Sequence, residues 1–176
     1  EVNNTWGMYF CVWAPNATAV SVKGNFNDWK NHEYALYPRW DKSGIWEGFI
    51  PGFKLGEAYK YHITGYGRKE IDKGDPFANF WEKRPQTASI TWDMHYDWED
   101  KEWMKKRKKH NSLEAPWSVY ELHLASWMRP DKNDEERYNS YDDIRDRLVP
   151  YLKETGFTHV EFMPLMEHPF DGSWGY

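Results

Sequence analysis

The sequence predicts a mainly β protein: an immunoglobulin-like antiparallel β-sandwich, then a helical linker and the first β-α-β of a (β/α)8 barrel. Two observations predict this fold class. In the first half, short runs of alternating apolar and polar residues are separated by turn residues every dozen or so positions, which is typical of a small sandwich. After Pro116 the pattern becomes strand, helix, strand, which is typical of parallel sheets. We expect a β-sandwich module over 1–95, a helical linker over 96–115 and an incomplete barrel over 116–176.

The strands expected in the sandwich are short and are bounded by turn clusters. They span residues 8–13, 19–24, 44–50, 58–64 and 88–92. Strict alternation within 19–24 and 58–64 indicates strands with one buried face. The clusters APNA, NFND and the dipeptide Pro51-Gly52 supply the turns. No segment with a helical period competes in this half of the chain.

The middle segment is expected to form one helix over about 97–109. Acidic residues precede basic ones along it, an order that suits the helix dipole at both ends. The basic run 105–109 has an alternative interpretation as a nucleic-acid patch. The acidic chain and the scarcity of aromatic residues beside the run favour a solvated helix face instead.

The last segment predicts two parallel strands, 118–124 and 157–163, joined by a helix. Ser140 is placed as the N-cap of that helix with Asp143 completing a capping box, and Gly156 ends it. A (β/α)8 barrel requires eight strands and typically about 250 residues. This segment therefore supplies the first quarter of a barrel, and we expect the chain to be a piece of a longer protein.

Composition and charge exclude several classes of function. The net charge of −5 gives no footprint for nucleic acid, and no apolar run approaches the roughly 20 residues of a membrane helix. Cys11 is the one cysteine of 176 residues, which fits a cytoplasmic location. No glycine-rich phosphate loop occurs, and no pair of His, Cys or carboxylate residues has metal-ligand spacing. We expect neither a cofactor nor a metal.

Aromatic residues are abundant, with twelve Trp, twelve Tyr and nine Phe making up 19% of the chain. Many belong in a β-rich core, where each buries roughly 150–250 Å². Tryptophan also offers a flat apolar face with a polar edge, which suits a sugar ring. The composition therefore favours a carbohydrate-binding protein.

Five stretches carry a resemblance to a known family. They are FCVWAPNA (10–17), GNFNDW (24–29), APWSVYELHLASW (115–127), GFTHVE (156–161) and MEHPFDGSWGY (166–176). In this order they resemble 1,4-α-glucan (glycogen) branching enzymes of the α-amylase superfamily. The resemblance implies a glucan-binding module, a helical linker and the opening of the catalytic barrel. It also implies α-glucan partners, namely glycogen, amylose and maltooligosaccharides, and a role in glycogen biosynthesis.

The chemistry implied by this resemblance cleaves an α-1,4 glucan bond and transfers the chain to a 6-hydroxyl with retention. Retention requires two carboxyl groups about 5–5.5 Å apart. In the family these groups follow later barrel strands, so we expect them beyond Tyr176. No catalytic residue is assigned in this chain, including Glu161 and Glu167, and we expect the chain alone to be inactive.

The resemblance also implies substrate-binding residues. Tyr176 matches the family tyrosine that stacks on the glucose at the cleavage point. Trp174 and His168 lie in the same stretch, with packing and loop-fixing as their respective alternatives. Trp29 resembles the tryptophan that glycogen-binding modules stack on glucan, with Trp46 and Lys60 as supporting residues.

Two rival functions stay open at the level of sequence. The first is a non-catalytic glycogen- or starch-binding module, which the barrel-like residues after Pro116 disfavour. The second is a debranching or trehalohydrolase relative, which shares the earlier motifs. The residues of the MEHPFDGSWGY stretch disfavour this second rival.

Overall fold

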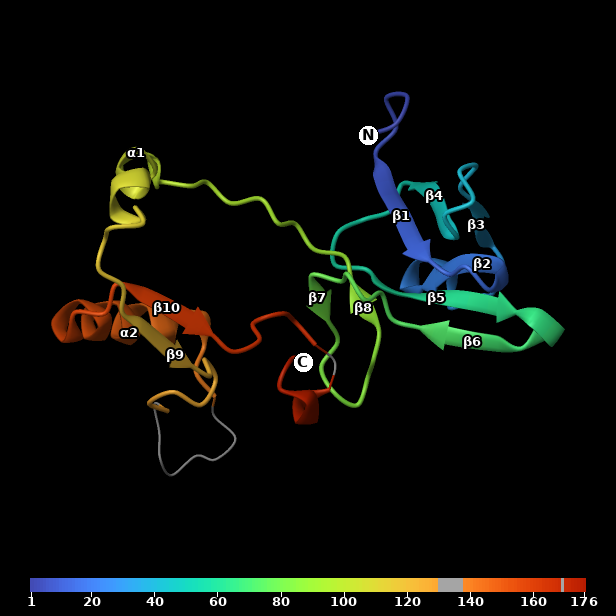
Figure 1. Cartoon of the computed structure of the whole chain (residues 1–176). Helices are drawn as coiled ribbons and strands as arrows, with labels where there is room; N and C mark the ends of the chain where they lie inside the picture. The colour runs from blue at the N-terminus through green and yellow to red at the C-terminus, as the bar shows by residue number, and fades with distance from the viewer. Residues whose placement is uncertain (130–137, 169) are drawn as a thin grey trace. The chain divides into compact units, whose positions relative to one another are not determined.

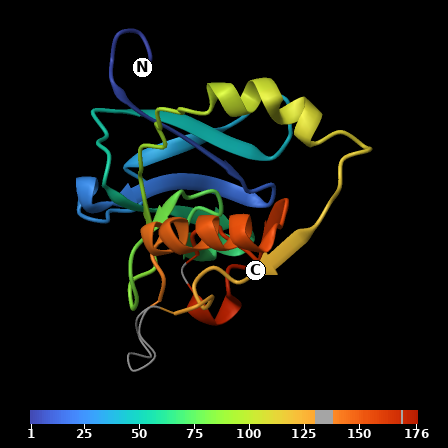
Figure 2. The same cartoon turned by 90° about the vertical axis from the view of Figure 1, so that its left-hand side faces the viewer.

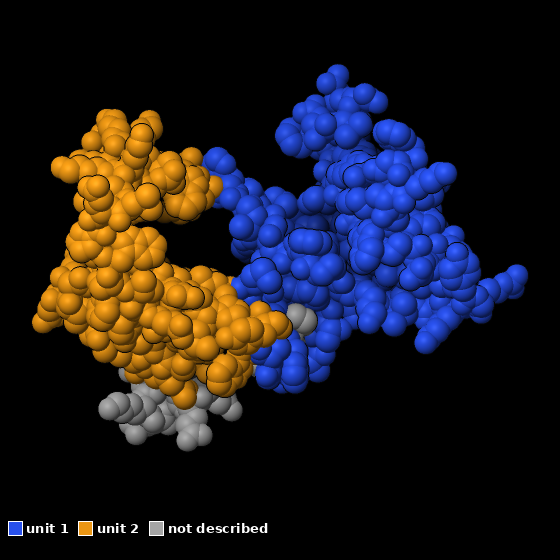
Figure 3. Space-filling view, viewed as in Figure 1, with its two compact units in different colours: residues 1–95, 166–173 blue, residues 96–165, 174–176 orange. Residues whose placement is uncertain are grey.

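The computed structural model describes residues 1–129, 138–168 and 170–176, which form two compact units (Figure 3). The first unit comprises residues 1–95 and 166–173, and the second comprises 96–165 and 174–176. Each unit has its own hydrophobic cluster.

The first unit is built on an antiparallel sheet that has eight strands within the described residues (Figure 1). They are β1 (Gly7–Trp13), β2 (Ala17–Gly24), β3 (Tyr34–Pro38), β4 (Ile45–Pro51), β5 (Ala58–Gly65), β6 (Glu70–Lys73), β7 (Phe80–Trp81) and β8 (Ser89–Ile90). Their hydrogen-bonded order is β1-β4-β3-β2-β5-β8-β7, and β6 also pairs with β5.

Strand β3 joins the two halves of this sheet. Leu36 pairs with Val20 of β2, whereas Tyr37 and Pro38 pair with β4. The sheet therefore curls as one hydrogen-bonded surface. The predicted mainly β, immunoglobulin-like character is confirmed in this curled form.

All five strands expected in this half are present, but β3, β6 and β7 are additional. All four residues of β6 are exposed, and its sequence, EIDK, has little apolar character. Strand β7 is two residues long. Neither offers the alternation that identifies a strand from sequence, because alternation reflects a buried face.

The core of the first unit lies on one face of the curled sheet. Its buried members are Phe10, Val20, Val22, Leu36, Ile50, Tyr59 and Tyr61. Phe10 meets Tyr59 edge to face at 5.0 Å between ring centroids, an arrangement that aromatic pairs prefer. Since side chains alternate along a strand, the residues between these on β2 and β5 point to the opposite, outer face.

The second unit contains α1 (Lys101–His110), β9 (Val119–Leu122), α2 (Tyr141–Thr155) and β10 (His159–Phe162). Figure 2 shows α1, in yellow, along its length. This helix begins at Lys101 rather than at Asp97. All its residues are exposed, with Glu102 in the first turn and basic residues in the last. The acidic-before-basic order therefore falls within the helix as predicted, and the preference for a solvated face over a nucleic-acid patch stays a prediction.

Helix α2 begins and ends as its local sequence predicts. The Ser140 hydroxyl accepts a hydrogen bond from the Asp143 N–H at 3.1 Å, and the Asp143 carboxylate accepts one from the Ser140 N–H at 3.0 Å. Gly156 adopts a left-handed φ of +79° and donates its N–H to the Leu152 carbonyl at 3.0 Å. Both caps supply partners for backbone groups at the helix ends.

Strands β9 and β10 pair in parallel and pack one face against α2. Leu122 of β9 is buried with Ile144 and Leu148 of the helix. On the opposite face, Glu121 and Glu161 are direct neighbours in the pairing register and are exposed. Within this unit the described residues bury only one side of the two-stranded sheet.

Candidate functional site

The turn that carries Trp29 follows β2 and is held by a buried asparagine. A short 3-10 turn, η1 (Asn25–Asn27), opens it. The Asn27 carboxamide accepts from the Gly24 N–H at 3.0 Å and donates to the Lys30 carbonyl at 3.0 Å. One side chain therefore ties both ends of the turn together.

Backbone geometry at the two ends of this turn restricts its sequence. A methyl group at Gly24 would lie 2.1 Å from the Ala58 carbonyl oxygen of β5, so only glycine allows the two strands to approach this closely. Asp28 and Trp29 both adopt left-handed φ values, +52° and +58°. The Trp29 N–H donates to the Gly24 carbonyl at 2.9 Å, which closes the turn.

The Trp29 side chain is half-buried, and its orientation is fixed by its own turn. The indole N–H donates to the Asn25 carboxamide oxygen at 2.9 Å. A ring fixed at its polar edge loses little freedom when a sugar covers its face. The arrangement suits stacking against a carbohydrate.

Polar side chains stand beside this turn on the outer face of the sheet. Lys23 of β2 and Lys60 of β5 are directly opposite in the register. The Lys23 ammonium donates to the Asn31 carboxamide at 2.7 Å, and that of Lys60 donates to the Thr87 hydroxyl at 2.7 Å. We call Trp29, Lys23, Asn31, Lys60 and Thr87 the outer-face site. The Lys60 ammonium and the Asn31 amide can donate hydrogen bonds to sugar hydroxyls. The Lys23 side chain is only 12% exposed and also pairs with Asp72 at 3.0 Å, so its role is to hold Asn31 in place.

Trp46, the other tryptophan singled out in this half, has different surroundings. It lies on β4, packs against the hydrophobic core and donates its indole N–H to the Ala14 carbonyl at 3.1 Å. This is a packing position. The structure assigns it no place among the residues of the outer-face site.

Two C-terminal aromatic residues lie exposed in the second unit. Tyr176 is 79% exposed and Trp174 is 57% exposed. The Trp174 ring centroid is 5.5 Å from that of His123. His123 is half-buried, and its Nδ1 lies 2.8 Å from the Ser126 hydroxyl. Both aromatic rings have surface available for contact with a sugar.

His168 belongs to the first unit, where it stabilises its own loop. Its Nδ1–H donates to the Met166 carbonyl at 2.9 Å, which is the loop-fixing interaction expected as the alternative. Its contact with substrate stays a prediction. The next residue of the MEHPFDGSWGY stretch, Pro169, lies outside the described residues.

A cavity of about 230 Å³ lies at the side of the core of the first unit. Asp75, which is buried in its wall, accepts hydrogen bonds from the Tyr59 hydroxyl at 2.7 Å and the Tyr61 hydroxyl at 3.1 Å. Burial raises the pKa of both tyrosines well above the usual range, and the Asp75 carboxylate raises it further. These hydroxyls stay protonated and serve the stability of the core.

Sequence reasoning misses one cluster of metal-ligating side chains. His32, His62 and Glu70 lie together on the outer face. They come from the β2–β3 connection, β5 and β6, so their spacing along the chain carries no signal. Only the pairing of the strands brings them together.

Comparison with known proteins connects these features to a family. Residues 1–78 match carbohydrate-binding module 48 (isoamylase N-terminal domain). The whole chain is 49% identical to a curated 1,4-alpha-glucan branching enzyme of Aquifex aeolicus and 45% identical to that of Bacillus subtilis. It spans 28% of the length of each of these relatives.

Solved structures resemble the chain in fold. A putative alpha amylase of Salmonella typhimurium superimposes with a TM-score of 0.66 at 19% identity, covering 100% of this chain and 26% of that one. A mutant of the PulA protein of Klebsiella pneumoniae, in complex with maltotriose, superimposes with a TM-score of 0.63 at 20% identity, covering 94% of this chain and 20% of that one. Among the described residues, no helix combines the length and apolar character needed to cross a bilayer.

Proposed function

We propose that the chain forms the glucan-binding module and the opening of the catalytic barrel of a 1,4-α-glucan branching enzyme. The premise is that the chain belongs to this enzyme family in the part that it covers. The whole enzyme would cleave α-1,4 glucan chains and transfer them to 6-hydroxyls during glycogen synthesis in the cytoplasm. The observation that carries this proposal is 49% identity over the entire chain. The proposed parts are 1–95, 96–115 and 116–176.

Two features of the second unit support the assignment of its parts. The β9-α2-β10 segment buries one face of a parallel pair and exposes the other, as expected for strands that need further neighbours. Helix α1 has no buried residue, which suits a connection between two parts of a chain. In the family that the chain resembles, the retaining carboxylates follow later barrel strands, so they are expected outside this chain.

We propose that the outer-face site binds α-glucan, with the Trp29 indole stacking on a glucose ring. Asn31 and Lys60 would then donate hydrogen bonds to hydroxyls at the edges of neighbouring sugars, and Lys23 would hold the Asn31 carboxamide in position. Glycogen, amylose and maltooligosaccharides all present this repeating pattern of apolar ring face and polar rim. The fixed indole ring supports this role because little freedom is lost on binding.

Titration with maltoheptaose, followed by tryptophan fluorescence and calorimetry, tests this site. We expect Trp29→Ala to weaken binding by about 1 kcal/mol or more, because the stacking face is lost. Trp40→Ala is the matched control, since Trp40 is 91% exposed in the same unit and belongs to no proposed site. Unchanged affinity in a folded Trp29→Ala protein would show that Trp29 is scaffold.

At the C-terminal stretch, we propose that Tyr176 stacks on the sugar whose bond is broken, with Trp174 and His168 as further contacts. In a branching enzyme that contains this chain, Tyr176→Ala should lower turnover by at least about tenfold, or about 1.4 kcal/mol. The Michaelis constant should change little, because the interaction strengthens as the sugar flattens toward the transition state. Tyr176→Phe should give an intermediate rate. Normal turnover per folded Tyr176→Ala molecule, measured beside a thermal melt, would remove Tyr176 from the site.

A further inference from the structure

His62 occupies an unusual position on the outer face of the sheet. It lies within β5 and is only 3% exposed. Its Nδ1 is 2.7 Å from an Asp72 carboxylate oxygen. Its Nε2 is buried and has no hydrogen-bond partner among the described residues. Buried polar atoms are nearly always paired, so this ring nitrogen calls for an explanation.

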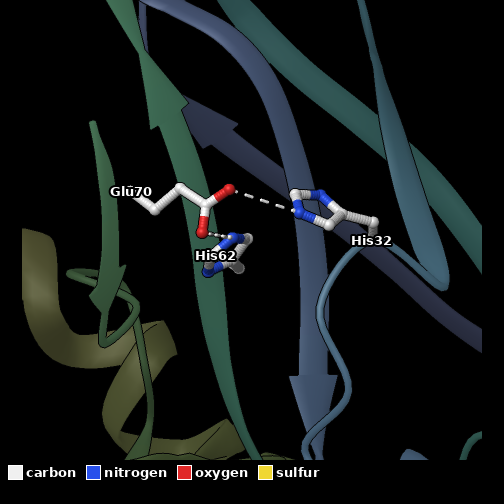
Figure 4. Close-up of side chains that lie close together, drawn as sticks. All are labelled: His32, His62 and Glu70. Carbon is white, nitrogen blue, oxygen red and sulfur yellow. Dashed lines mark ion pairs between the residues drawn. The ribbon is translucent and has the colours of Figure 1, made fainter. Parts of the chain in front are cut away.

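The Glu70 carboxylate and the His32 imidazole lie beside this nitrogen. In Figure 4 the Glu70 carboxylate lies between the rings of His62 and His32 and directs one oxygen toward each. These oxygens are 3.6 Å from His62 Nε2 and 3.5 Å from His32 Nε2. Each nitrogen thus faces its own oxygen of the same carboxylate, at a separation close to the roughly 3.4 Å between neighbouring ligands of a tetrahedral metal with bonds of about 2.0–2.1 Å.

The fold builds this arrangement from three segments. In the β5–β6 register Asp72 is opposite His62, and Glu70 is two residues away on the same face. On the other side of β5, Ser21 of β2 is opposite His62. The Ser21 hydroxyl accepts the His32 N–H at 3.1 Å, and His32 adopts a left-handed φ of +66°. Its ring then lies 4.8 Å from that of His62, centroid to centroid.

Asp72 completes the arrangement from behind. Its carboxylate accepts a hydrogen bond from the Nδ1–H of His62 at 2.7 Å, which directs the Nε2 side of the ring at the cluster. The other Asp72 carboxylate oxygen accepts a hydrogen bond from the Lys23 ammonium at 3.0 Å. Both oxygens are therefore held in place, as expected of a carboxylate that orients a metal-binding histidine.

We propose that His32 Nε2, His62 Nε2 and the Glu70 carboxylate bind a single Zn²⁺, with Asp72 orienting His62. The three ligand atoms lie within 4.8 Å of one another, and the half-exposed His32 ring can turn to close the widest gap. Two imidazoles and a carboxylate suit zinc, whereas Ca²⁺ and Mg²⁺ prefer oxygen ligands alone. Water would fill the remaining position. The ion would fasten the β2–β3 connection to the β5–β6 hairpin.

Metal titration of the 176-residue chain tests the site. After treatment with a chelator, the chain should bind one Zn²⁺ by calorimetry and one Co²⁺ with visible absorption typical of nitrogen and oxygen ligands. Zinc at about a hundredfold excess over its dissociation constant should raise the melting temperature of the first unit by about 5 °C or more. His32→Gln and Glu70→Gln should each weaken zinc binding by at least about tenfold.

His110→Gln is the matched control, because His110 is an exposed histidine on α1 in the other unit. We expect this variant to bind zinc like the unmodified chain. The side chains of His32 and Glu70 are 55% and 47% exposed, so their glutamine variants should keep the fold, which circular dichroism verifies. The proposal would be overturned if the unmodified chain bound no zinc. It would also be overturned if the His32→Gln and Glu70→Gln variants bound zinc as tightly as the unmodified chain. The cluster would then consist of side chains that contact one another without a metal ion.

Discussion

The two units bury their apolar residues to very different extents. In the first, the sheet curls so that residues from β1, β2, β3, β4 and β5 meet in one core. Among the described residues of the second unit, only Leu122, Ile144 and Leu148 form a fully buried apolar cluster. This cluster lies between the two strands and the helix. A curled sheet can enclose its own interior, whereas one β-α-β segment covers a single face. The difference indicates that a unit becomes stable when its sheet encloses a hydrophobic core, and that regular strand and helix patterns alone are not enough.

Separating the units provides the largest test of this comparison. A fragment of residues 1–95 should fold, whereas a fragment of 116–176 should not, because its two strands retain open edges and an uncovered face. Amide hydrogen exchange on the two fragments measures this directly. Strong protection in isolated 116–176 would mean that this segment has a core of its own.

Alkaline pH should distinguish the units by their buried tyrosines. The folded-state pKa values of Tyr59 and Tyr61 are raised, first by burial and then by Asp75, above the unfolded value of about 10. Their stabilisation is fully present below that value and is lost as pH rises toward the folded pKa. Each tyrosine should lower the free energy of unfolding of the first unit by up to about 1.4 kcal/mol per pH unit.

Denaturant titrations between about pH 8 and about pH 12 measure this slope. Tyr61→Phe is the control, since it removes one titrating hydroxyl and should give a shallower dependence. In the second unit, the pKa of Tyr151 is also raised, first by its hydrogen bond with Tyr120. That ring is nearer to solvent, so a smaller dependence is expected there. Equal slopes for both units would contradict the comparison.

Capping of α2 should have the smallest effect. Ser140→Ala removes the hydroxyl that accepts the Asp143 N–H and should lower the stability of the second unit by about 1 kcal/mol. Ser140→Asp should restore most of this loss, because aspartate is an equally good N-cap. Thermal melts of the intact chain, followed in both units, compare the variants. Destabilisation confined to the first unit would be inconsistent with this role.

Local features of the fold were predictable, and paired features were not. The ends of α2 follow from Ser140, Asp143 and Gly156, because a cap is formed by residues within a few positions of each other. Strand β6 has four exposed residues and exists through its pairing with β5. Its sequence therefore lacks the alternation that a half-buried strand requires.

The candidate sites divide in the same way. Trp29 is recognisable because the GNFNDW motif contains both the turn and the stacking ring, although its left-handed backbone is visible only in the structure. His32, His62 and Glu70 were missed because each comes from a different segment. A search by sequence spacing detects ligands on one helix or loop, but it does not detect ligands joined by strand register.

The exposed charges of β6 have a consequence for the behaviour of the protein at high concentration. Within the described residues, β6 pairs only with β5. Its other side is therefore a sheet edge, where backbone N–H and C=O groups could pair with a strand of another molecule. Such an edge is a template for intermolecular β-pairing. Glu70, Asp72 and Lys73 lie along this edge, where an incoming apolar strand would have to desolvate them. The polar sequence that makes β6 hard to predict should therefore also disfavour aggregation through this edge of the sheet.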